Sequence, residues 1–413
     1  MKKNIHLCIL AVLAAVLLAG CKESGPVAET AGGDAGSQQV DLLVWGAQED
    51  EALLNEIFES FEREYAGQAD FRITFAPQSE SNCMDALLGD LEEGADVFAF
   101  ADDQLNTLVA AGALEPVEGA DVVKAANLEE AVEAASIGGT LYAYPLTADN
   151  GYFLYYNKAY FTEEDITSLE RMLEAAARQE RKVAMDWSSG WYVYSFFGNT
   201  GLTVGLNDDG ITNFCTWNGT EGPIRGTDVA QSMLNLAESP GFLNTGDEGF
   251  LSGVRDGSVA AGVSGVWNAV ALEEIWGSDY GASKLPSYTC AGQQIQMASY
   301  SGYKLIGVNA YSESREWASR LAEWISNEEN QKLRFELRGQ GPANKNAAAS
   351  KEVQDSPAIA ALLEQSEFSC TQRLGGKFWD PVSAFAGNMA LGNPSGQNLQ
   401  EQLDQMVEEI TAP

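Results

Sequence analysis

The spacing of apolar residues predicts alternating strands and helices in the first part of the chain. Three short apolar runs have the length and composition of buried strands, and stretches with apolar side chains at helical spacing lie between them. The predicted strands are 41–46, 71–75 and 95–100, and the predicted helices are 53–65, with Asp50 as its N-cap, 84–91 and 104–111. Strands that alternate with helices predict an α/β fold in which helices cover a parallel sheet.

Two aromatic-rich runs, 142–146 and 152–156, flank a short polar segment in the middle of the chain. This segment contains Thr147, Asp149 and Asn150. A continuous apolar strand is usually buried on both faces, so a polar segment between two such runs indicates a crossing from one sheet to another. Ligand clefts form where chains cross between lobes. A folded region of about 370 residues suits two α/β lobes rather than one.

The beginning of the chain has the pattern of a secretory signal. A basic start is followed by an apolar run over 5–19, which is too short to span a membrane comfortably, and by Leu-Ala-Gly-Cys at 18–21. We expect residues 1–20 to be a lipoprotein signal peptide, in preference to an uncleaved anchor helix. Cys21 would then carry the lipid that holds the protein on the membrane surface. Residues 21–39 are small and polar, which predicts a flexible tether.

Charge and histidine content exclude several functions. The formal net charge is −36, and it becomes −38 without residues 1–20, which hold two lysines and no acid. A nucleic-acid partner needs a basic surface, so we expect none. The single histidine, His6, lies in the predicted signal. The mature chain would therefore lack histidine-dependent catalysis and histidine-ligated zinc, and we expect no cofactor.

Four cysteines remain once the signal is removed and Cys21 is acylated. They are Cys83, Cys215, Cys290 and Cys370. Their spacing matches no metal-binding motif. Outside the cytoplasm they could form disulfides in any of three pairings, or remain as free, buried, small apolar side chains.

Several segments together resemble a known family. Residues 139–158, "GTLYAYPLTADNGYFLYYNK", are similar to the first interlobe crossing of bacterial extracellular solute-binding proteins of the maltodextrin-binding type, which capture carbohydrates for ABC importers. Residues 95–117, 250–267 and 299–343 resemble further segments of that family. The resemblance implies a periplasmic-binding-protein-like fold with a hinge of about three crossings and an interlobe cleft. The implied boundaries are 40–147 and 302–342 for lobe 1, and 148–301 and 343–413 for lobe 2.

The resemblance also implies a set of ligand-binding residues. Phe100 would stack on sugar, Asp103 would bind a hydroxyl group, and Asp149 would be an acid beside the hinge. Aromatic faces bury the C–H side of a pyranose, while carboxylates and amides accept its hydroxyl groups. The predicted ligand-binding residues are Trp45, Phe100, Asp103, Asp149, Asn150, Trp191, Trp267 and Trp379. We expect Trp267 to dominate binding, because it follows a strand end and a glycine.

Local alternatives exist for some of these positions. Asp102 is better explained as a helix cap, and Asp103 fits either a first-turn acid or a hydroxyl-binding group. Tyr192, beside Trp191, fits the core of its helix as well as it fits a binding site.

The implied function is the substrate-binding subunit of an ABC importer. We expect a monomer that captures a malto- or other oligosaccharide and delivers it, by lobe closure, to permease subunits with an associated ATPase. One alternative is a different solute on the same fold, such as an amino acid, a polyamine, or ferric iron held by Tyr155 and Tyr156. A glycoside hydrolase with paired carboxylates is a second alternative, but the sequence fixes no such pair. We therefore expect no enzyme activity.

Overall fold

The computed structural model describes residues 38–413. The predicted signal peptide, the lipidated Cys21 and nearly all of the predicted tether lie outside the described residues. The first strand, β1 (Gln38–Gly46), includes the last two residues of the expected tether. Within residues 38–413, no helix is long and apolar enough to cross a membrane.

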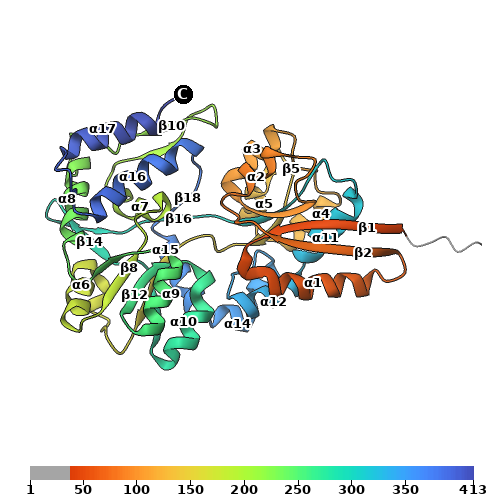
Figure 1. Ribbon diagram of the computed structural model, residues 1–413, viewed down its shortest axis with the longest axis horizontal. Coiled ribbons are helices and arrows are strands. Elements are labelled where there is room, and N and C mark those ends of the chain that lie inside the picture. Colours follow the sequence, from red (N-terminus) through yellow and green to blue (C-terminus); the bar gives the residue numbers. More distant parts are fainter. Residues whose placement is uncertain (1–37) are drawn as a thin grey trace, which may run out of the picture. The chain divides into compact units, whose positions relative to one another are not determined.

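The first lobe, which contains β1 and β2 in Figure 1, is built on a five-stranded sheet in the order β2-β1-β3-β17-β6. Its strands are β1, β2 (Ala69–Pro77), β3 (Val97–Ala101), β6 (Tyr144–Thr147) and β17 (Lys304–Val308). β1 is parallel to β2 and to β3, as the sequence predicts. β17 is antiparallel to β3 and β6, so the sheet is mixed. β17, from late in the chain, thus lies in the same sheet as β1.

Helices cover the first sheet and close its core. They include α1 (Glu51–Glu64), α2 (Cys83–Gly89), α3 (Leu105–Ala110), α11 (Arg315–Ile325) and α12 (Glu328–Arg338). On α1, the buried residues Leu54, Ile57 and Phe61 recur at helical spacing and pack into this core. The ring of Phe61 meets those of Trp317 and Trp324 edge to face, which joins α1 to α11.

The second lobe is built on another mixed five-stranded sheet, in the order β11-β8-β12-β7-β13. Its strands are β7 (Phe153–Asn157), β8 (Lys182–Met185), β11 (Phe242–Asn244), β12 (Val259–Ser264) and β13 (Tyr280–Ser283). Successive residues of β7 point to opposite faces, so Leu154 and Tyr156 enter one core cluster while Phe153 and Tyr155 enter the other. The sheet is therefore buried on both sides, as the apolar run over 152–156 predicts.

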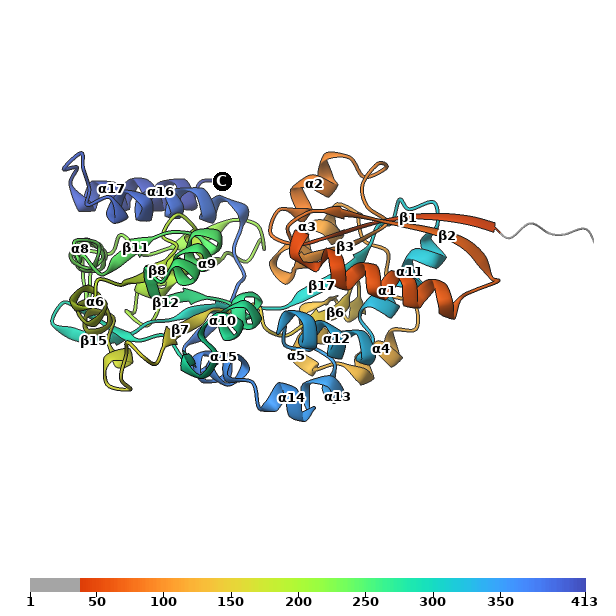
Figure 2. The same cartoon turned by 60° about the horizontal axis from the view of Figure 1, so that its bottom comes forward.

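The helices of the second lobe lie on both faces of this sheet. They include α6 (Leu169–Arg178), α7 (Gly190–Phe197), α8 (Gly226–Ala237), α9 (Asp247–Asp256), α10 (Ala269–Trp276), α15 (Pro357–Ser366), α16 (Trp379–Ala390) and α17 (Leu399–Ile410). The last two helices run side by side in both views (Figures 1 and 2). Met389 of α16 and Met406 of α17 are both buried in the larger core cluster.

Shorter elements complete the described part of the chain. The remaining strands are β4 (Ser136–Ile137), β5 (Thr140–Leu141), β9 (Val204–Leu206), β10 (Asn213–Cys215), β14 (Ser287–Cys290), β15 (Gln293–Gln296), β16 (Ser299–Ser301) and β18 (Ser369–Thr371). The remaining α-helices are α4 (Ala120–Ala126), α5 (Glu129–Ala134), α13 (Lys345–Ala348) and α14 (Lys351–Gln354). The sequence did not decide whether the last four cysteines form disulfides. In the structure, all four are free thiols.

Three segments connect the lobes, and we call them the first, second and third crossings. They are 148–152, between β6 and β7; 302–303, between β16 and β17; and 339–356, between α12 and α15. Hydrogen bonds tie them together, because Ala148 N donates to Gly341 O at 2.9 Å and Asn150 N donates to Gly302 O at 3.2 Å. Within the third crossing, Lys345 of α13 still bonds to Ala125 of the first lobe, so contact with that lobe extends past residue 342.

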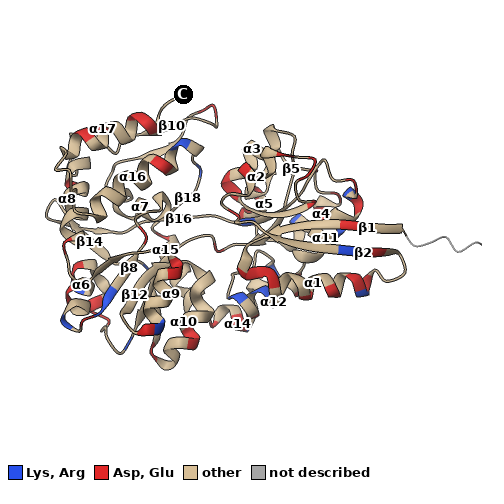
Figure 3. Ribbon diagram, in the orientation of Figure 1, with Lys and Arg blue, Asp and Glu red and all other residues tan. Residues whose placement is uncertain are grey.

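Acidic residues greatly outnumber basic ones and lie over both lobes (Figure 3). Most of the ion pairs found among residues 38–413 are exposed, and several join neighbouring turns of one helix. Such pairs contribute little to stability. The buried charges gather instead near the crossings, and they form part of the site described next.

Candidate functional site

Trp267 lies where the structure turns from β12 into a short 3₁₀ helix, η4 (Val266–Asn268). Its side chain is partly exposed, unlike the residues on either side of it. The indole Nε1–H donates to Oδ2 of Asp247, at the start of α9, over 2.9 Å. A Cβ atom on Gly265 would lie only 2.1 Å from Cζ3 of the ring. Glycine is therefore required where the ring packs over the backbone.

Trp191 lies in the first turn of α7 and is also partly exposed. Its Nε1–H donates to Oε1 of Gln372 over 2.7 Å. Its ring meets that of Tyr152 edge to face at 4.6 Å. The neighbouring Tyr192 is buried, with 6% of its surface exposed, and belongs to the core cluster. This favours the core alternative for Tyr192.

The structure brings Trp191 and Trp267 together. Their ring centroids lie 5.8 Å apart, and the ring planes are inclined by 33°. Both rings come from the second lobe, one from the start of a helix and one from the end of a strand. We refer to them as the tryptophan pair. Aromatic faces of this kind can bury the apolar C–H side of a pyranose.

Asp103 lies in the 3₁₀ helix η2 (Asp102–Gln104), which directly follows β3. Its Oδ1 is buried and has no hydrogen-bond partner within residues 38–413. Burial, reinforced by the nearby charge of Asp102, raises the pKa of Asp103 to about 7, against the opposing hydrogen bond from the side chain of Gln372. The carboxyl group thus has an acceptor position that the protein leaves unused.

Gln372 connects this acid to the tryptophan pair. It follows β18, and its side chain bonds to Asp103 of the first lobe and to Trp191 of the second. Its backbone N–H donates to Ser301 O over 3.0 Å, which fixes it beside the second crossing. The sequence does not predict Gln372, because no motif surrounds it.

Asp102 has a structural role that differs from the predicted helix cap. Its Oδ1 accepts from the backbone N–H of Tyr303 over 3.0 Å, and Ala101 is the residue that precedes the short helix. Burial raises the pKa of Asp102 to about 6. The side chain therefore joins the end of β3 to the second crossing.

Asp149 and Asn150 belong to the first crossing. Asp149 is 2% exposed, and its carboxylate accepts from the backbone N–H of Gly341 in the third crossing. Burial raises the pKa of Asp149, although the charge of Lys304 opposes this shift. Asn150 is 9% exposed and lies against Gly302 of the second crossing. Both side chains therefore contact the crossings themselves.

Lys304, at the start of β17, is a buried cation that the sequence analysis did not single out. Its Nζ lies 3.3 Å from Oε1 of Glu80 and 5.4 Å from the ring centroid of Trp267. Burial would lower the pKa of Lys304, but the charges of Glu80, Asp149 and Asp50 raise it. A first-lobe ammonium group therefore faces a second-lobe ring across the crossings.

Asp50 forms a second buried charge cluster near the crossings. It pairs with Arg334 and, over 2.9 Å, with Nε of Arg338. Burial alone would raise the pKa of Asp50, but the charge and hydrogen bond of Arg334 and the charge of Arg338 hold it below its usual range. Asp50 precedes α1 but makes no side-chain cap, so the predicted cap is replaced by these ion pairs.

Among the described residues, the other predicted aromatic side chains make no ring contact with the tryptophan pair. Phe100 is fully buried in the first-lobe core, where its ring packs against Phe98, so it offers no face to a ligand. Trp45 is half-buried near the end of β1 and packs on the same core. Trp379, the first residue of α16, is half-buried and meets Phe378 edge to face at 5.0 Å.

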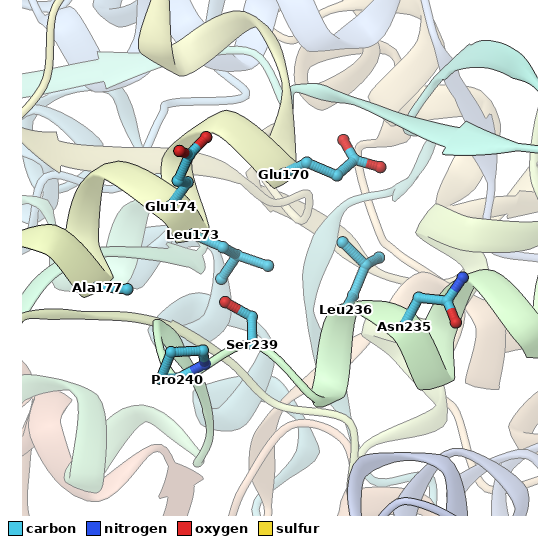
Figure 4. A pocket seen from close by; sticks show the side chains of 8 residues that line it. All are labelled: Glu170, Leu173, Glu174, Ala177, Asn235, Leu236, Ser239 and Pro240. Atoms are coloured by element: carbon cyan, nitrogen blue, oxygen red, sulfur yellow. The ribbon is translucent and has the colours of Figure 1, made fainter.

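A surface pocket of about 300 Å³ lies elsewhere, between α6 and α8 (Figure 4). Its lining includes Glu170 and Glu174 from one helix and Asn235 from the other. None of the predicted ligand-binding residues lines it.

Comparison with known proteins settles the family. The family of bacterial extracellular solute-binding proteins matches residues 56–361, which is most of the chain. The chain belongs to this family. Its members bind solutes, so this chain is a binding protein rather than an enzyme.

Individual relatives match along nearly the whole chain. The chain is 27% identical to a galactooligosaccharide-binding protein of Bacillus subtilis (strain 168), covering 99% of this chain and 96% of that protein. It is 25% identical to a maltooligosaccharide ABC transporter solute-binding lipoprotein of Streptococcus pneumoniae serotype 4 (strain ATCC BAA-334 / TIGR4). That match covers 94% of this chain and 91% of the relative.

Solved structures show the same fold. A structure solved with acarbose aligns with a TM-score of 0.77 at 28% identity, over 90% of this chain and 99% of that one. The maltose/maltodextrin-binding domain of Bdellovibrio bacteriovorus, bound to maltotriose, aligns with a TM-score of 0.75 at 19% identity, over 89% and 99%. The predicted periplasmic-binding-protein-like fold with two α/β lobes is confirmed.

Proposed function

We propose that this protein captures an oligosaccharide outside the cytoplasmic membrane for an ABC importer. The observation that carries the proposal is the tryptophan pair, with rings 5.8 Å apart and both N–H groups held by protein acceptors. Because each N–H is already bonded to the protein, what the two partly exposed rings offer a ligand is apolar surface. Such faces suit the C–H side of a sugar ring.

The polar groups near the pair support the same ligand class. The unused Oδ1 of Asp103 can accept a sugar hydroxyl, whether the carboxyl group is ionised or protonated. Gln372 places this acid in the same hydrogen-bond chain as Trp191. The relatives whose names specify a ligand bind galactooligosaccharide or maltooligosaccharide, which agrees with this inference.

A binding screen on the mature domain tests the proposal. The panel contains maltotriose, a galactooligosaccharide trimer, maltose, the common amino acids and spermidine. A ligand that binds only the folded state raises the melting temperature, and calorimetric titration then gives its affinity. We expect one of the saccharides to bind and the other solutes to have no effect. A shift with an amino acid or spermidine, and none with any saccharide, would overturn the sugar assignment.

Lobe closure is the second part of the proposal. Three crossings tied by hydrogen bonds form a hinge about which two rigid lobes can rotate. Small-angle X-ray scattering should show a smaller radius of gyration when saturating sugar is present. An unchanged radius in the presence of a sugar that binds would count against closure.

Membrane anchoring through Cys21 is the third part. A lipidated cysteine would hold the binding domain near a permease and its ATPase, with the protein acting as a monomer. Cys21→Ser should move the protein from the membrane fraction to the soluble extracytoplasmic fraction. Retention in the membrane fraction would show that another segment anchors it.

Ferric iron is disfavoured by the placement of the adjacent tyrosines. Tyr155 is fully buried, and its hydroxyl donates to Gly265 O over 3.0 Å. Tyr156 points to the opposite face of the sheet and is 4% exposed. The two phenol groups therefore cannot bind one ion together.

A further inference from the structure

We propose that Asp247 is a positioning residue that fixes the orientation of Trp267 for ligand binding. This inference rests on the proposed function, because it assigns a role within the same site. Asp247 was not predicted from the sequence. It lies 20 residues before Trp267, at the start of α9, and its Oδ2 accepts the indole N–H over 2.9 Å.

The other carboxylate oxygen is also fully engaged. Oδ1 of Asp247 accepts from Ser264 Oγ over 2.7 Å and from Asn268 Nδ2 over 2.8 Å. The same Nδ2 lies 2.9 Å from Ser264 Oγ, which closes a small ring of polar groups. Ser264 and Asn268 flank the segment that carries Trp267, and both are buried. Asp247 therefore holds the indole ring and the backbone beneath it as one unit.

The chemistry of this cluster calls for a carboxylate. Three neighbouring groups donate to Asp247, and an ionised carboxylate has two oxygens that only accept. An asparagine has one accepting oxygen and an amide that donates. It could therefore serve Trp267 or Asn268, but not both with good geometry. A lost partner would leave a buried donor unsatisfied.

The backbone under the ring is fixed from a further side. Gly265 permits the close approach of the indole, and its carbonyl oxygen accepts from the hydroxyl of Tyr155. With the N–H edge held by Asp247 and the backbone held by Tyr155, the ring is pre-organised before ligand arrives. A binding side chain whose rotamer is locked by surrounding hydrogen bonds loses less entropy when it binds.

The test compares Asp247→Asn with Glu248→Gln. Both changes remove one negative charge from the first turn of α9, but Glu248 is exposed and no hydrogen bond links it to Trp267. By calorimetric titration with maltotriose and a galactooligosaccharide trimer, Asp247→Asn should weaken binding roughly ten- to a hundredfold, as expected for a lost bond to a charged group. Glu248→Gln should bind like the wild type.

A double-mutant cycle separates positioning from general support of the fold. Trp267→Phe keeps an aromatic face but has no N–H to be held. If Asp247 acts through the indole N–H, Asp247→Asn should change affinity much less in the Trp267→Phe background than in the wild type. An equal loss in both backgrounds, or no loss in the wild type, overturns the proposal.

A readout without ligand distinguishes this inference from the proposed function. Asp247→Asn should alter the near-ultraviolet circular dichroism of the tryptophans, and the same change in the Trp267→Phe background should not. If no saccharide binds the wild-type protein but this difference is seen, the sugar assignment fails and the positioning role stands. If saccharide binds and the spectra do not change, the positioning role fails alone. If Asp247→Asn does not fold, Trp267→Phe serves as the fallback variant, because it removes the same hydrogen bond by changing the donor. An affinity equal to that of the wild type in Trp267→Phe would also overturn the proposal.

Discussion

Trp191 donates its indole N–H to Oε1 of Gln372 over 2.7 Å, although 181 residues separate the two in the chain. The amide of Gln372 also bonds to Asp103 of the first lobe, so one side chain joins both lobes beside the second crossing. This link depends on an amide, because the same group must accept from an indole and donate to a carboxylate.

Gln372→Glu should therefore weaken ligand binding and destabilise the fold. A glutamate can accept from Trp191 but, when ionised, it cannot donate to Asp103, and two carboxylates would then face each other. We expect a loss of roughly 1–3 kcal/mol in the free energy of unfolding near neutral pH, measured with denaturant. The loss should shrink in acid, where one carboxyl group of the pair becomes protonated. A loss that is the same at both pH values would contradict this account.

Trp267→Ala should remove most of the binding energy and much less of the stability. A central aromatic residue in a binding site contributes about 2–4 kcal/mol or more. A buried core tryptophan would instead cost ~3–5 kcal/mol of unfolding free energy. Trp267 is partly exposed, so we expect the first pattern. Titration with sugar and denaturant unfolding on the same variant separate the two.

The matched control for that variant is Trp187→Ala. Trp187 is fully buried in the second-lobe core and should show the second pattern. Normal sugar binding by Trp267→Ala, together with easy unfolding, would move the site toward Trp191 and Trp379.

Much of this architecture could be predicted from the sequence, because local patterns encode it. The apolar runs that became β1, β2 and β3 each lie in one continuous stretch. The polar segment around Asp149 marks a true crossing, since buried strands lie on both sides of it. The strand end and the glycine that precede Trp267 could be recognised in the sequence, and the structure contains both.

The rest of the site depends on contacts between distant parts of the chain. Lys304 and its partner Glu80 are 224 residues apart, and Gln372 reaches residues in both lobes. No local pattern signals such pairs. The family resemblance implied that Phe100 stacks on the ligand, but every residue of β3 is buried. In a strand buried on both faces, alternation cannot show which side chain reaches the surface.

Asp103 should make stability depend on pH. In the folded state its pKa is raised to about 7 from 3.8, chiefly by burial. Between these values the folded state binds more protons than the unfolded chain, so the free energy of unfolding should fall as pH rises. The contribution of this group is fully present below the unfolded pKa and is lost as pH rises through about 7.

Asp103→Asn removes this titration and should flatten the slope between about pH 4 and 7. A residual slope should remain, because burial also raises the pKa of Asp102 to about 6. Denaturant unfolding at a series of pH values measures both slopes. A variant whose stability falls with pH as steeply as the wild type would show that Asp103 is already ionised across this range.

Asp50 should have the opposite pH dependence and a large effect on stability. It pairs with Arg334 in a buried position, where removal of one partner leaves an uncompensated charge. Asp50→Asn should therefore cost ~3–5 kcal/mol in the free energy of unfolding. The folded-state pKa of Asp50 is lowered, so its contribution is present above the unfolded pKa and is lost as pH falls through the folded value. The deficit of the variant should accordingly shrink in acid.

The matched control for Asp50→Asn is Asp355→Asn. Asp355 pairs with Lys351 on the exposed face of α14, where water screens the charges. This variant should unfold at the same denaturant concentration as the wild type at every pH. Since Asp50 joins the start of α1 to α12, which leads into the third crossing, Asp50→Asn should also lower sugar affinity if the hinge depends on this pair. Full affinity in a destabilised Asp50→Asn protein would restrict the ion pair to holding the first lobe together.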